Sequence, residues 1–126
     1  MNRFTSFLFA LLMAFVFTPD GMAKAKDFTV GKNTFLIGGK PIVIKAAEIH
    51  YPRIPREYWE HRMKMCKALG MNTVCIYIFW NIHEQKEGQF DFTGNNDIAA
   101  FCRLAQKNDL YVIVRPGPYV CAEWEM

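Results

Sequence analysis

The chain has 126 residues, enough for one small domain at most, and carries a formal net charge of +3. Hydrophobic residues make up 52% of it, aromatic residues 15% and charged residues 21%, a globular composition rich in aromatic rings. Basic residues form no run anywhere in the sequence, which argues against a nucleic-acid partner.

Residues 1–25 have the features of an export signal. Arg3 provides a positive start, residues 7–17 are uniformly apolar, and Ala23-Lys-Ala25 fits a small-x-small cleavage site. The apolar run is shorter than the roughly 20 residues that a membrane helix needs. We therefore expect a signal peptide over residues 1–25 and a secreted or periplasmic protein, in preference to an uncleaved membrane anchor.

Short apolar segments after residue 25 predict an antiparallel entry to the fold. Residues 28–30 and 34–37 flank Gly31-Lys-Asn33, which favours a hairpin turn. A second turn is expected at residues 38–41. The first long strand is then predicted to begin at residue 42 and to continue to about His50.

Residues 56–69 have the spacing of an amphipathic helix that ends at Gly70. Its predicted apolar stripe consists of Trp59, Met63, Cys66 and Leu69. Residues 73–80 follow as a run that is apolar on both alternating faces. This pattern is typical of a parallel strand covered on both sides.

A polar loop over residues 81–94 precedes a second predicted helix, capped by Asn95 or Asn96 and ending near Asn108. Its inner stripe is predicted to consist of Ile98, Phe101, Cys102 and Ala105. Residues 111–114 are expected to form a third long strand, which is buried. This strand leads into a terminal loop that combines charged, aromatic and proline residues, a mixture that suits a sugar ring.

The order strand, helix, strand, helix, strand predicts an α/β fold with parallel strands and right-handed crossovers. A doubly wound dinucleotide fold should carry a glycine-rich turn after its first strand, and none occurs after Glu48. In a barrel, polar residues gather after the carboxyl end of each strand. They do so here: Glu48, His50, Tyr51 and Arg53; Trp80, Asn81, His83 and Glu84; Arg115, Tyr119, Glu123 and Trp124. A partial (β/α)8 barrel, with three β/α units after a short hairpin, is favoured.

Several glutamates are candidates for carbohydrate chemistry. Glu87 is expected to be solvated in its loop, whereas Glu84 could equally orient its loop or contact a ligand. Glu123 and Glu125 lie two residues apart, so in an extended segment at most one of them faces a site. Both remain candidates as acceptors for sugar hydroxyls.

Metal and nucleophile chemistry is weakly supported. His50, His61 and His83 lie on different elements, and structural hydrogen bonding is the better interpretation for His50 and His83. We expect no metal and no cofactor. Cysteine spacing fits no zinc pattern, and the expected free, buried thiols are those of Cys66, Cys75 and Cys102. Cys121 lacks a nearby histidine and is expected to position backbone rather than to attack substrate.

Three motifs resemble the β-galactosidases of glycoside hydrolase family 35. They are Glu48-Ile-His-Tyr-Pro-Arg-Ile-Pro-Arg56, Tyr77-Ile-Phe-Trp-Asn-Ile-His-Glu84 with Gly88-Gln-Phe-Asp-Phe92, and Arg115-Pro-Gly-Pro-Tyr-Val-Cys-Ala-Glu-Trp-Glu125. The likeness covers about residues 28–126. It implies a hydrolase with an N-terminal (β/α)8 barrel that removes terminal β-linked galactose from glycans with retention of configuration. Carried over, the galactose contacts are Tyr77, Cys121, Ala122 and Glu123.

The resemblance also implies that this chain holds no catalytic residue. In the family, the acid/base glutamate follows the fourth strand and the nucleophile follows the seventh. Residues 26–126 are accordingly expected to be the N-terminal part of the catalytic domain, inactive as an isolated fragment. Two alternatives stay open: a stand-alone galactose-binding remnant, and another β-glycosidase of similar barrel architecture.

Overall fold

The computed structural model describes residues 26–121, and the chain divides into two compact units between Ile42 and Val43. The first unit contains three antiparallel strands in the order β1-β2-β3, with bounds Phe28–Val30, Phe35–Ile37 and Lys40–Ile42. Gly38 and Gly39 form the turn between β2 and β3 with φ of 56° and 75°. Only glycine adopts such angles without steric cost, so these residues permit the tight reversal. The expected export signal, residues 1–25, lies outside the described residues.

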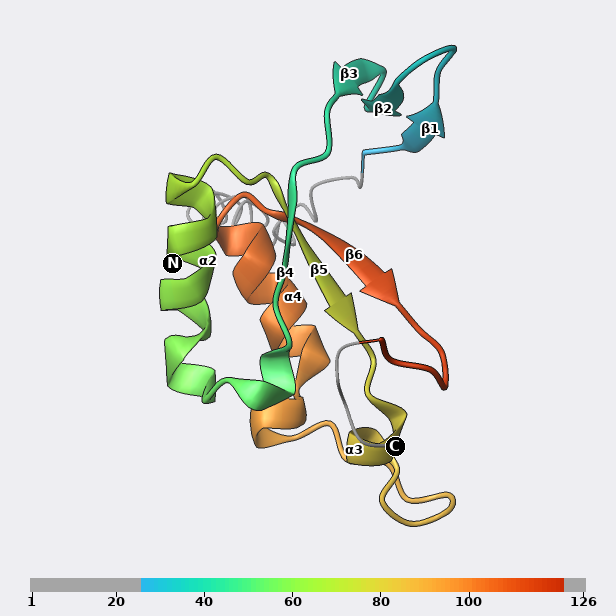
Figure 1. Ribbon diagram of the computed structural model, residues 1–126, viewed down its shortest axis with the longest axis vertical. Coiled ribbons are helices and arrows are strands. Elements are labelled where there is room, and N and C mark those ends of the chain that lie inside the picture. Colours follow the sequence, from blue (N-terminus) through green and yellow to red (C-terminus); the bar gives the residue numbers. More distant parts are fainter. Residues whose placement is uncertain (1–25, 122–126) are drawn as a thin grey trace, which may run out of the picture. The chain divides into compact units, whose positions relative to one another are not determined.

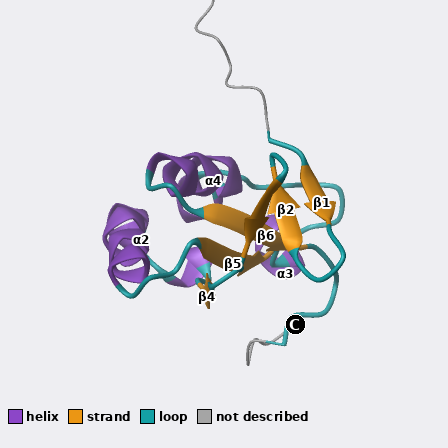
Figure 2. Ribbon diagram, turned by 90° about the horizontal axis from the view of Figure 1, so that it is seen from above, coloured by secondary structure: helices purple, strands orange, loops and turns teal. Residues whose placement is uncertain are grey.

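The second unit is a parallel sheet joined by helices, a mixed α/β arrangement (Figure 1). The strands β4 (Ala46–Glu48), β5 (Thr73–Tyr77) and β6 (Tyr111–Arg115) lie in the order β4-β5-β6. The two long connecting helices are α2 (Trp59–Ala68) and α4 (Ile98–Lys107). Figures 1 and 2 show both of them on the same side of the sheet. Shorter helical segments are η1 (Tyr51–Arg53), η2 (Arg56–Tyr58), α3 (Trp80–His83) and η3 (Gly94–Asn96).

The predicted continuous strand from residue 42 to His50 is wrong. Residue 42 ends β3, residues 43–45 form no strand, and β4 begins only at Ala46. The amide side chain of Asn72 explains the break. It donates to the Val43 carbonyl at 2.8 Å and accepts from the Lys45 amide at 2.9 Å. These side-chain bonds satisfy the Val43 carbonyl and the Lys45 amide where the structure has no strand.

The two other predicted strands also differ from expectation, one in its length and the other in its burial. The strand predicted for residues 73–80 ends at Tyr77, and Trp80 begins the short helix α3. The third strand, β6, is not buried: among the described residues it pairs only with β5, and Tyr111, Ile113 and Val114 are all exposed. The apolar pattern of β6 could not distinguish an outer strand from the central strand β5, whose residues are mostly buried.

Helix boundaries follow capping residues. Gly70 lies just beyond α2 with φ of 81°, and the Met71 amide donates to the Cys66 carbonyl at 3.0 Å, as expected for a glycine-terminated helix. The cap of α4 is Asp97, not Asn95 or Asn96. Its Oδ1 accepts from the Ala100 amide at 2.8 Å, and this bond lowers the pKa of the Asp97 carboxyl. The Asn95 side chain instead accepts from the backbone amide of Arg56 at 3.0 Å, which removes it from the capping role.

Helices α2 and α4 are connected at both ends. At the first ends, the Arg56 guanidinium donates to Asp97 Oδ2 at 3.3 Å and to the Gly94 carbonyl at 3.2 Å. Near the last turns, Lys67 Nζ donates to the Asp109 carbonyl at 3.1 Å. These contacts join the two crossover segments near both of their ends.

Aromatic rings form the centre of the core between the sheet and the helices. Tyr51, Trp59, Phe79 and Phe101 are fully buried, and the Trp59 and Phe101 rings meet edge to face at 5.3 Å. The Trp59 indole donates to the Tyr51 carbonyl at 3.1 Å, so its buried N–H is satisfied. The predicted stripe of α4 is confirmed: Phe101 and Ala105 are buried, and Ile98 and Cys102 pack against the same core.

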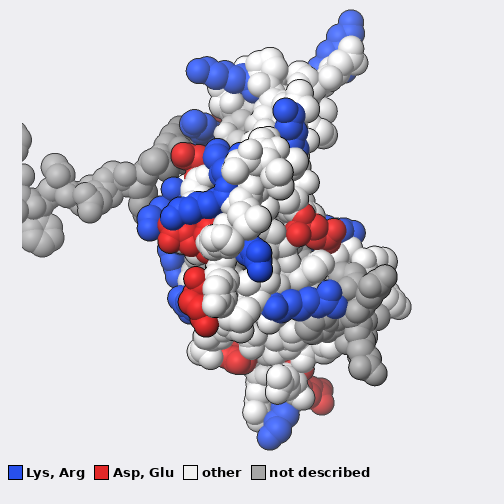
Figure 3. Space-filling model, turned by 60° about the vertical axis from the view of Figure 1, so that its left-hand side comes forward, with Lys and Arg blue, Asp and Glu red and all other residues white. Residues whose placement is uncertain are grey.

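The surface of the described residues carries both charges. In Figure 3, red acidic and blue basic groups are interspersed on the face displayed. Glu60 on α2, for example, lies 3.3 Å from Lys64 Nζ and 3.6 Å from Lys107 Nζ. Within residues 26–121, no helix has the length and apolarity to cross a membrane.

All four cysteines are free thiols. Cys66, Cys75 and Cys102 are half-buried, rather than fully buried as expected, and Cys121 is exposed. Burial raises the pKa of the Cys66 and Cys102 thiols, which keeps them protonated and poorly reactive at neutral pH.

Candidate functional site

Four side chains converge at the carboxyl ends of the parallel strands. Glu48 ends β4 and is followed closely by His50, Tyr77 ends β5, and Arg115 ends β6. The sheet register places Tyr77 directly opposite Arg115, and Glu48 opposite Cys75, two residues earlier on β5. We call Glu48, His50, Tyr77 and Arg115 the strand-end cluster.

Arg115 links the three strands of the cluster. Its guanidinium carbon lies 4.0 Å from the centroid of the Tyr77 ring, within the range of a cation–π interaction. The same guanidinium donates to Glu48 Oε1 at 3.4 Å. Arg115 and Glu48 are each nearly half exposed, whereas Tyr77 is only 4% exposed. The cluster therefore combines a charged, solvent-facing pair with a sheltered aromatic ring.

His50, two residues after the end of β4, lies beside Tyr77. The two rings are nearly parallel, with an interplanar angle of 16° and centroids 6.0 Å apart. His50 Nδ1 is buried and has no hydrogen-bond partner among residues 26–121. Burial lowers the pKa of His50 and the charge of Arg53 lowers it further, while Glu48 opposes both effects. His50 is consequently a neutral ring near pH 7, with one ring nitrogen that no described residue satisfies.

The cluster can bind a polar ligand but has no pair of free carboxylates. The hydroxyl of Tyr77 makes no hydrogen bond within the described part of the chain. It can therefore donate to or accept from a ligand hydroxyl. The only carboxylate of the cluster, Glu48, is paired with Arg115. Residues 26–121 also contain no group of three acidic, histidine or cysteine side chains suited to a metal ion.

Two of the polar residues expected at the strand ends, Tyr51 and His83, belong to the core instead. Tyr51 Oη and His83 Nε2 lie 2.5 Å apart, and His83 Nδ1 lies 2.7 Å from the Asp91 carbonyl oxygen. Because a carbonyl only accepts, Nδ1 carries the proton and the Tyr51 hydroxyl donates to Nε2. Burial raises the pKa of Tyr51, and the Cys102 thiolate would raise it further. The structural interpretation of His83 is thus confirmed.

Glu84 orients its own loop. Its Oε1 accepts from the Gly88 amide at 2.7 Å, and its Oε2 accepts from the Trp80 indole N–H. Both carboxylate oxygens therefore have partners within the loop. Of the two roles that the sequence left open for Glu84, loop orientation is the one that the structure supports. Glu87 is exposed, as expected.

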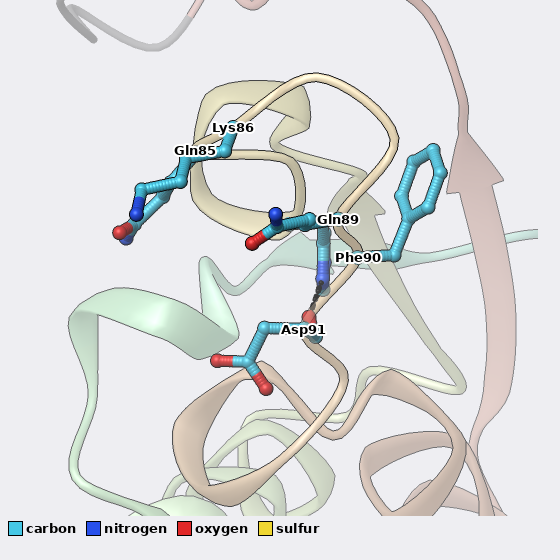
Figure 4. A pocket seen from close by; sticks show the side chains of 6 residues that line it. Gln85, Lys86, Gln89, Phe90 and Asp91 are labelled. Atoms are coloured by element: carbon cyan, nitrogen blue, oxygen red, sulfur yellow. Dashed lines mark hydrogen bonds between the residues drawn. The ribbon is translucent and has the colours of Figure 1, made fainter.

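A separate open pocket of about 290 Å³ lies on the hairpin after α3. Its lining residues are His83, Gln85, Lys86, Gln89, Phe90 and Asp91. Figure 4 shows the Phe90 ring pointing to the opposite side of the hairpin from Gln85 and Lys86. The Phe90 ring and the polar side chains of Gln85 and Lys86 therefore do not face one ligand position. The strand-end cluster is the better candidate site.

The terminal loop is only partly described. Tyr119 is 77% exposed, Val120 packs into the core with 8% exposure, and Cys121 is exposed. The buried side chain of Val120 thereby anchors the backbone next to Cys121. Of the predicted sugar contacts, Tyr77 lies in the strand-end cluster, while Ala122 and Glu123 lie outside the described residues.

One interaction in the site could not be expected from the sequence. The sequence places Arg115 and Glu48 at strand ends, but it gives no sign that they pair over Tyr77. The signal that could have revealed it is the parallel register, which brings residues 67 positions apart to one sheet edge. The register between β4, β5 and β6 cannot be read from the sequence alone.

The fold and the cluster define an α/β protein with a polar and aromatic site at the carboxyl edge of a parallel sheet. The family model described as "Glycosyl hydrolases family 35" matches residues 34–126. The chain therefore belongs to glycosyl hydrolases family 35.

Individual relatives agree with this assignment. "Beta-galactosidase" of Xanthomonas manihotis is 55% identical over 91 residues, covering 72% of this chain and 15% of the relative. "Beta-galactosidase" of Canis lupus familiaris is 43% identical over 106 residues, covering 82% and 16%. "Beta-galactosidase-1-like protein 3" of Homo sapiens is 47% identical over 96 residues, covering 76% and 15%. The chain thus spans about 15% of the length of the relatives that it matches.

Proposed function

We propose that this chain supplies part of the substrate pocket of a retaining β-galactosidase that removes terminal β-linked galactose from glycans. In this proposal, β4, β5 and β6 are the first three strands of a (β/α)8 barrel, preceded by the β1–β2 hairpin. The observation that carries it is the strand-end cluster, which lies at the carboxyl edge where barrel enzymes build their sites. The family membership supplies the class of substrate.

The proposed substrate contacts are those implied by the family likeness. Tyr77 carries, at the edge of a sheltered ring, a hydroxyl with no partner among residues 26–121, and this hydroxyl suits a hydrogen bond with a sugar hydroxyl. The backbone at Cys121 and Ala122 would contact the galactose, and the Glu123 carboxylate would accept from its hydroxyls. The buried Val120 supports this role because it fixes the chain just before these residues.

We assign no catalytic residue to residues 26–121. A retaining glycosidase needs two carboxyl groups roughly 5–5.5 Å apart, one as nucleophile and one as acid/base. The two described glutamates near strand ends already have partners: Glu48 pairs with Arg115, and both oxygens of Glu84 hold its loop. The proposal is that the catalytic pair comes from elsewhere in the protein and that residues 1–126 alone do not hydrolyse glycosides.

Hydrolysis of chromogenic glycosides tests this function. The protein as its gene encodes it, and the isolated 126-residue chain, are assayed with p-nitrophenyl β-galactoside, β-glucoside and β-mannoside. We expect galactoside turnover by the encoded protein, with the β-anomer of galactose as first product in ¹H NMR, and none by the isolated chain. Preference for glucoside or mannoside would refute the galactosidase proposal. Turnover by the isolated chain would refute the external catalytic pair.

We also propose that the protein is exported, on the basis of the sequence of residues 1–25. Expression in a bacterial host followed by fractionation and N-terminal sequencing tests it. The expected product begins near Lys26 in the periplasm or medium. A cytoplasmic product that retains residues 1–25 would contradict export.

A further inference from the structure

We propose that Arg115, held in place by Glu48, is a positioning residue that fixes the Tyr77 ring for substrate. This inference rests on the proposed function, because it assigns Tyr77 a sugar contact. It adds two residues that the predicted galactose contacts do not include. Neither is proposed to touch the sugar.

The geometry of Arg115 points to positioning. Its guanidinium carbon lies 4.0 Å from the Tyr77 ring centroid, and the register places the two residues opposite each other on adjacent strands. A cation over an aromatic face is attracted to the ring quadrupole and restricts tilting of the ring. The hydroxyl at the end of that ring has no partner among residues 26–121. Its direction is therefore set by the ring contacts rather than by a hydrogen bond.

Glu48 holds the Arg115 side chain in place over Tyr77. Its Oε1 accepts from the Arg115 guanidinium at 3.4 Å, which anchors a long and flexible side chain over Tyr77. Glu48 and Arg115 come from the outer strands β4 and β6, and Tyr77 comes from the central strand β5 between them. The pair thus crosses the strand whose terminal side chain it holds.

Stability alone does not account for the pair. Both side chains are nearly half exposed, 46% for Arg115 and 44% for Glu48. Ion pairs with such exposure are screened by water and contribute little to folding. The other contact of the guanidinium is the sheltered Tyr77 ring, so the consequence of losing Arg115 should appear in ligand recognition.

A double-mutant cycle on the encoded protein tests the proposal. Values of kcat/KM are measured for the parent, Tyr77→Phe, Arg115→Met and the double variant, with the best of the three p-nitrophenyl glycosides. Each single change is expected to lower kcat/KM about tenfold, and the double change also by about tenfold rather than a hundredfold. Arg115→Lys should recover part of the loss, and Glu48→Gln should cost about threefold. Arg62→Met on the exposed face of α2 is the matched control and should retain parental activity.

Additive losses in the cycle would overturn the positioning role, since Arg115 would then act independently of the Tyr77 hydroxyl. A second readout does not depend on activity: ¹⁹F NMR of the 3-fluorotyrosine-labelled protein, with the Tyr77 resonance identified by its absence in Tyr77→Phe. Arg115→Met should shift or broaden that resonance without any sugar present, and Arg62→Met should not. An unchanged resonance would refute the contact, whereas a shifted resonance in a protein that ignores galactosides would refute only the proposed function.

Discussion

His83 and His50 both follow parallel strands and both lie beside a tyrosine, but their surroundings differ. His83 is 3% exposed, and both of its ring nitrogens have partners in Tyr51 and Asp91. His50 is half-buried, stacks on Tyr77, and has a buried Nδ1 with no partner in residues 26–121. The first ring closes the core, and the second borders a site that has unsatisfied polar groups. Position at a strand end is therefore insufficient to assign a role.

The largest effect is expected from removing the core ring. His83→Ala leaves the buried Tyr51 hydroxyl without its acceptor and opens a cavity, at an expected cost of about 2–4 kcal/mol in the free energy of unfolding. Urea denaturation measures the change. His61→Ala, at an exposed histidine on α2, is the matched control and should stay within about 0.5 kcal/mol of the parent. An equal loss of unfolding free energy in the two variants would contradict the structural role of His83 in the core.

The second test replaces each ring by phenylalanine. His50→Phe keeps the stacking on Tyr77 and removes the unpartnered nitrogen, so the stability should be unchanged or up to about 1 kcal/mol higher. His83→Phe removes both hydrogen bonds and should destabilise by about 1–3 kcal/mol. Melting temperatures of the two variants give the sign. Destabilisation by His50→Phe would contradict an unpartnered Nδ1 in the folded protein.

Alkaline pH provides a smaller, directional test of the buried pair. Burial raises the pKa of Tyr51 above its ordinary value of 10.0, so the unfolded chain loses this proton first as the pH rises. The contribution of Tyr51 is complete below pH 10 and declines above it. Unfolding measured from pH 8 to pH 11 should show a steeper decline for the parent than for Tyr51→Phe. Parallel curves would contradict a buried, neutral hydroxyl.

The smallest effect belongs to His50 at acid pH. Its pKa is lowered from 6.5, so the unfolded chain takes up this proton first as the pH falls. Stability is therefore complete above about pH 6.5 and declines below it. The exposed part of the ring makes this decline shallow, and His50→Phe should abolish it. Thermal unfolding at pH 7.5 and pH 5 measures the difference, and an identical pH response in both proteins would contradict the shifted pKa.

The fold could be predicted best where the spacing of apolar residues and glycines allows only one interpretation. The stripe of α4 and the glycine that ends α2 follow from local spacing, and the structure has both. The break between β3 and β4 depends on the Asn72 side chain, 27 residues from Lys45, so no local pattern could show it. Exposure of β6 likewise depends on how many strands flank it, a property of the sheet and not of residues 111–115.

The same division applies to the site. Glu48, His50, Tyr77 and Arg115 could each be placed at a strand end from the sequence, and family likeness singled out Tyr77. Their mutual arrangement depended on register, which fixes Tyr77 opposite Arg115. The prediction that groups Tyr51 with the polar residues is wrong: its neighbours His50 and Arg53 are polar, but its own ring fills the core.

The double attachment of α2 to α4 has a mechanical consequence. Arg56 joins Asp97 at one end of the helix pair, and Lys67 joins the Asp109 carbonyl at the other. A slip of one helix past the other by a single turn, about 5.4 Å, would break both attachments at once. Both contacts would therefore oppose the sliding of one crossover segment along the other. Because α2 precedes β5 and α4 precedes β6 by only a few residues, such a slip would also displace the starts of these two strands relative to each other.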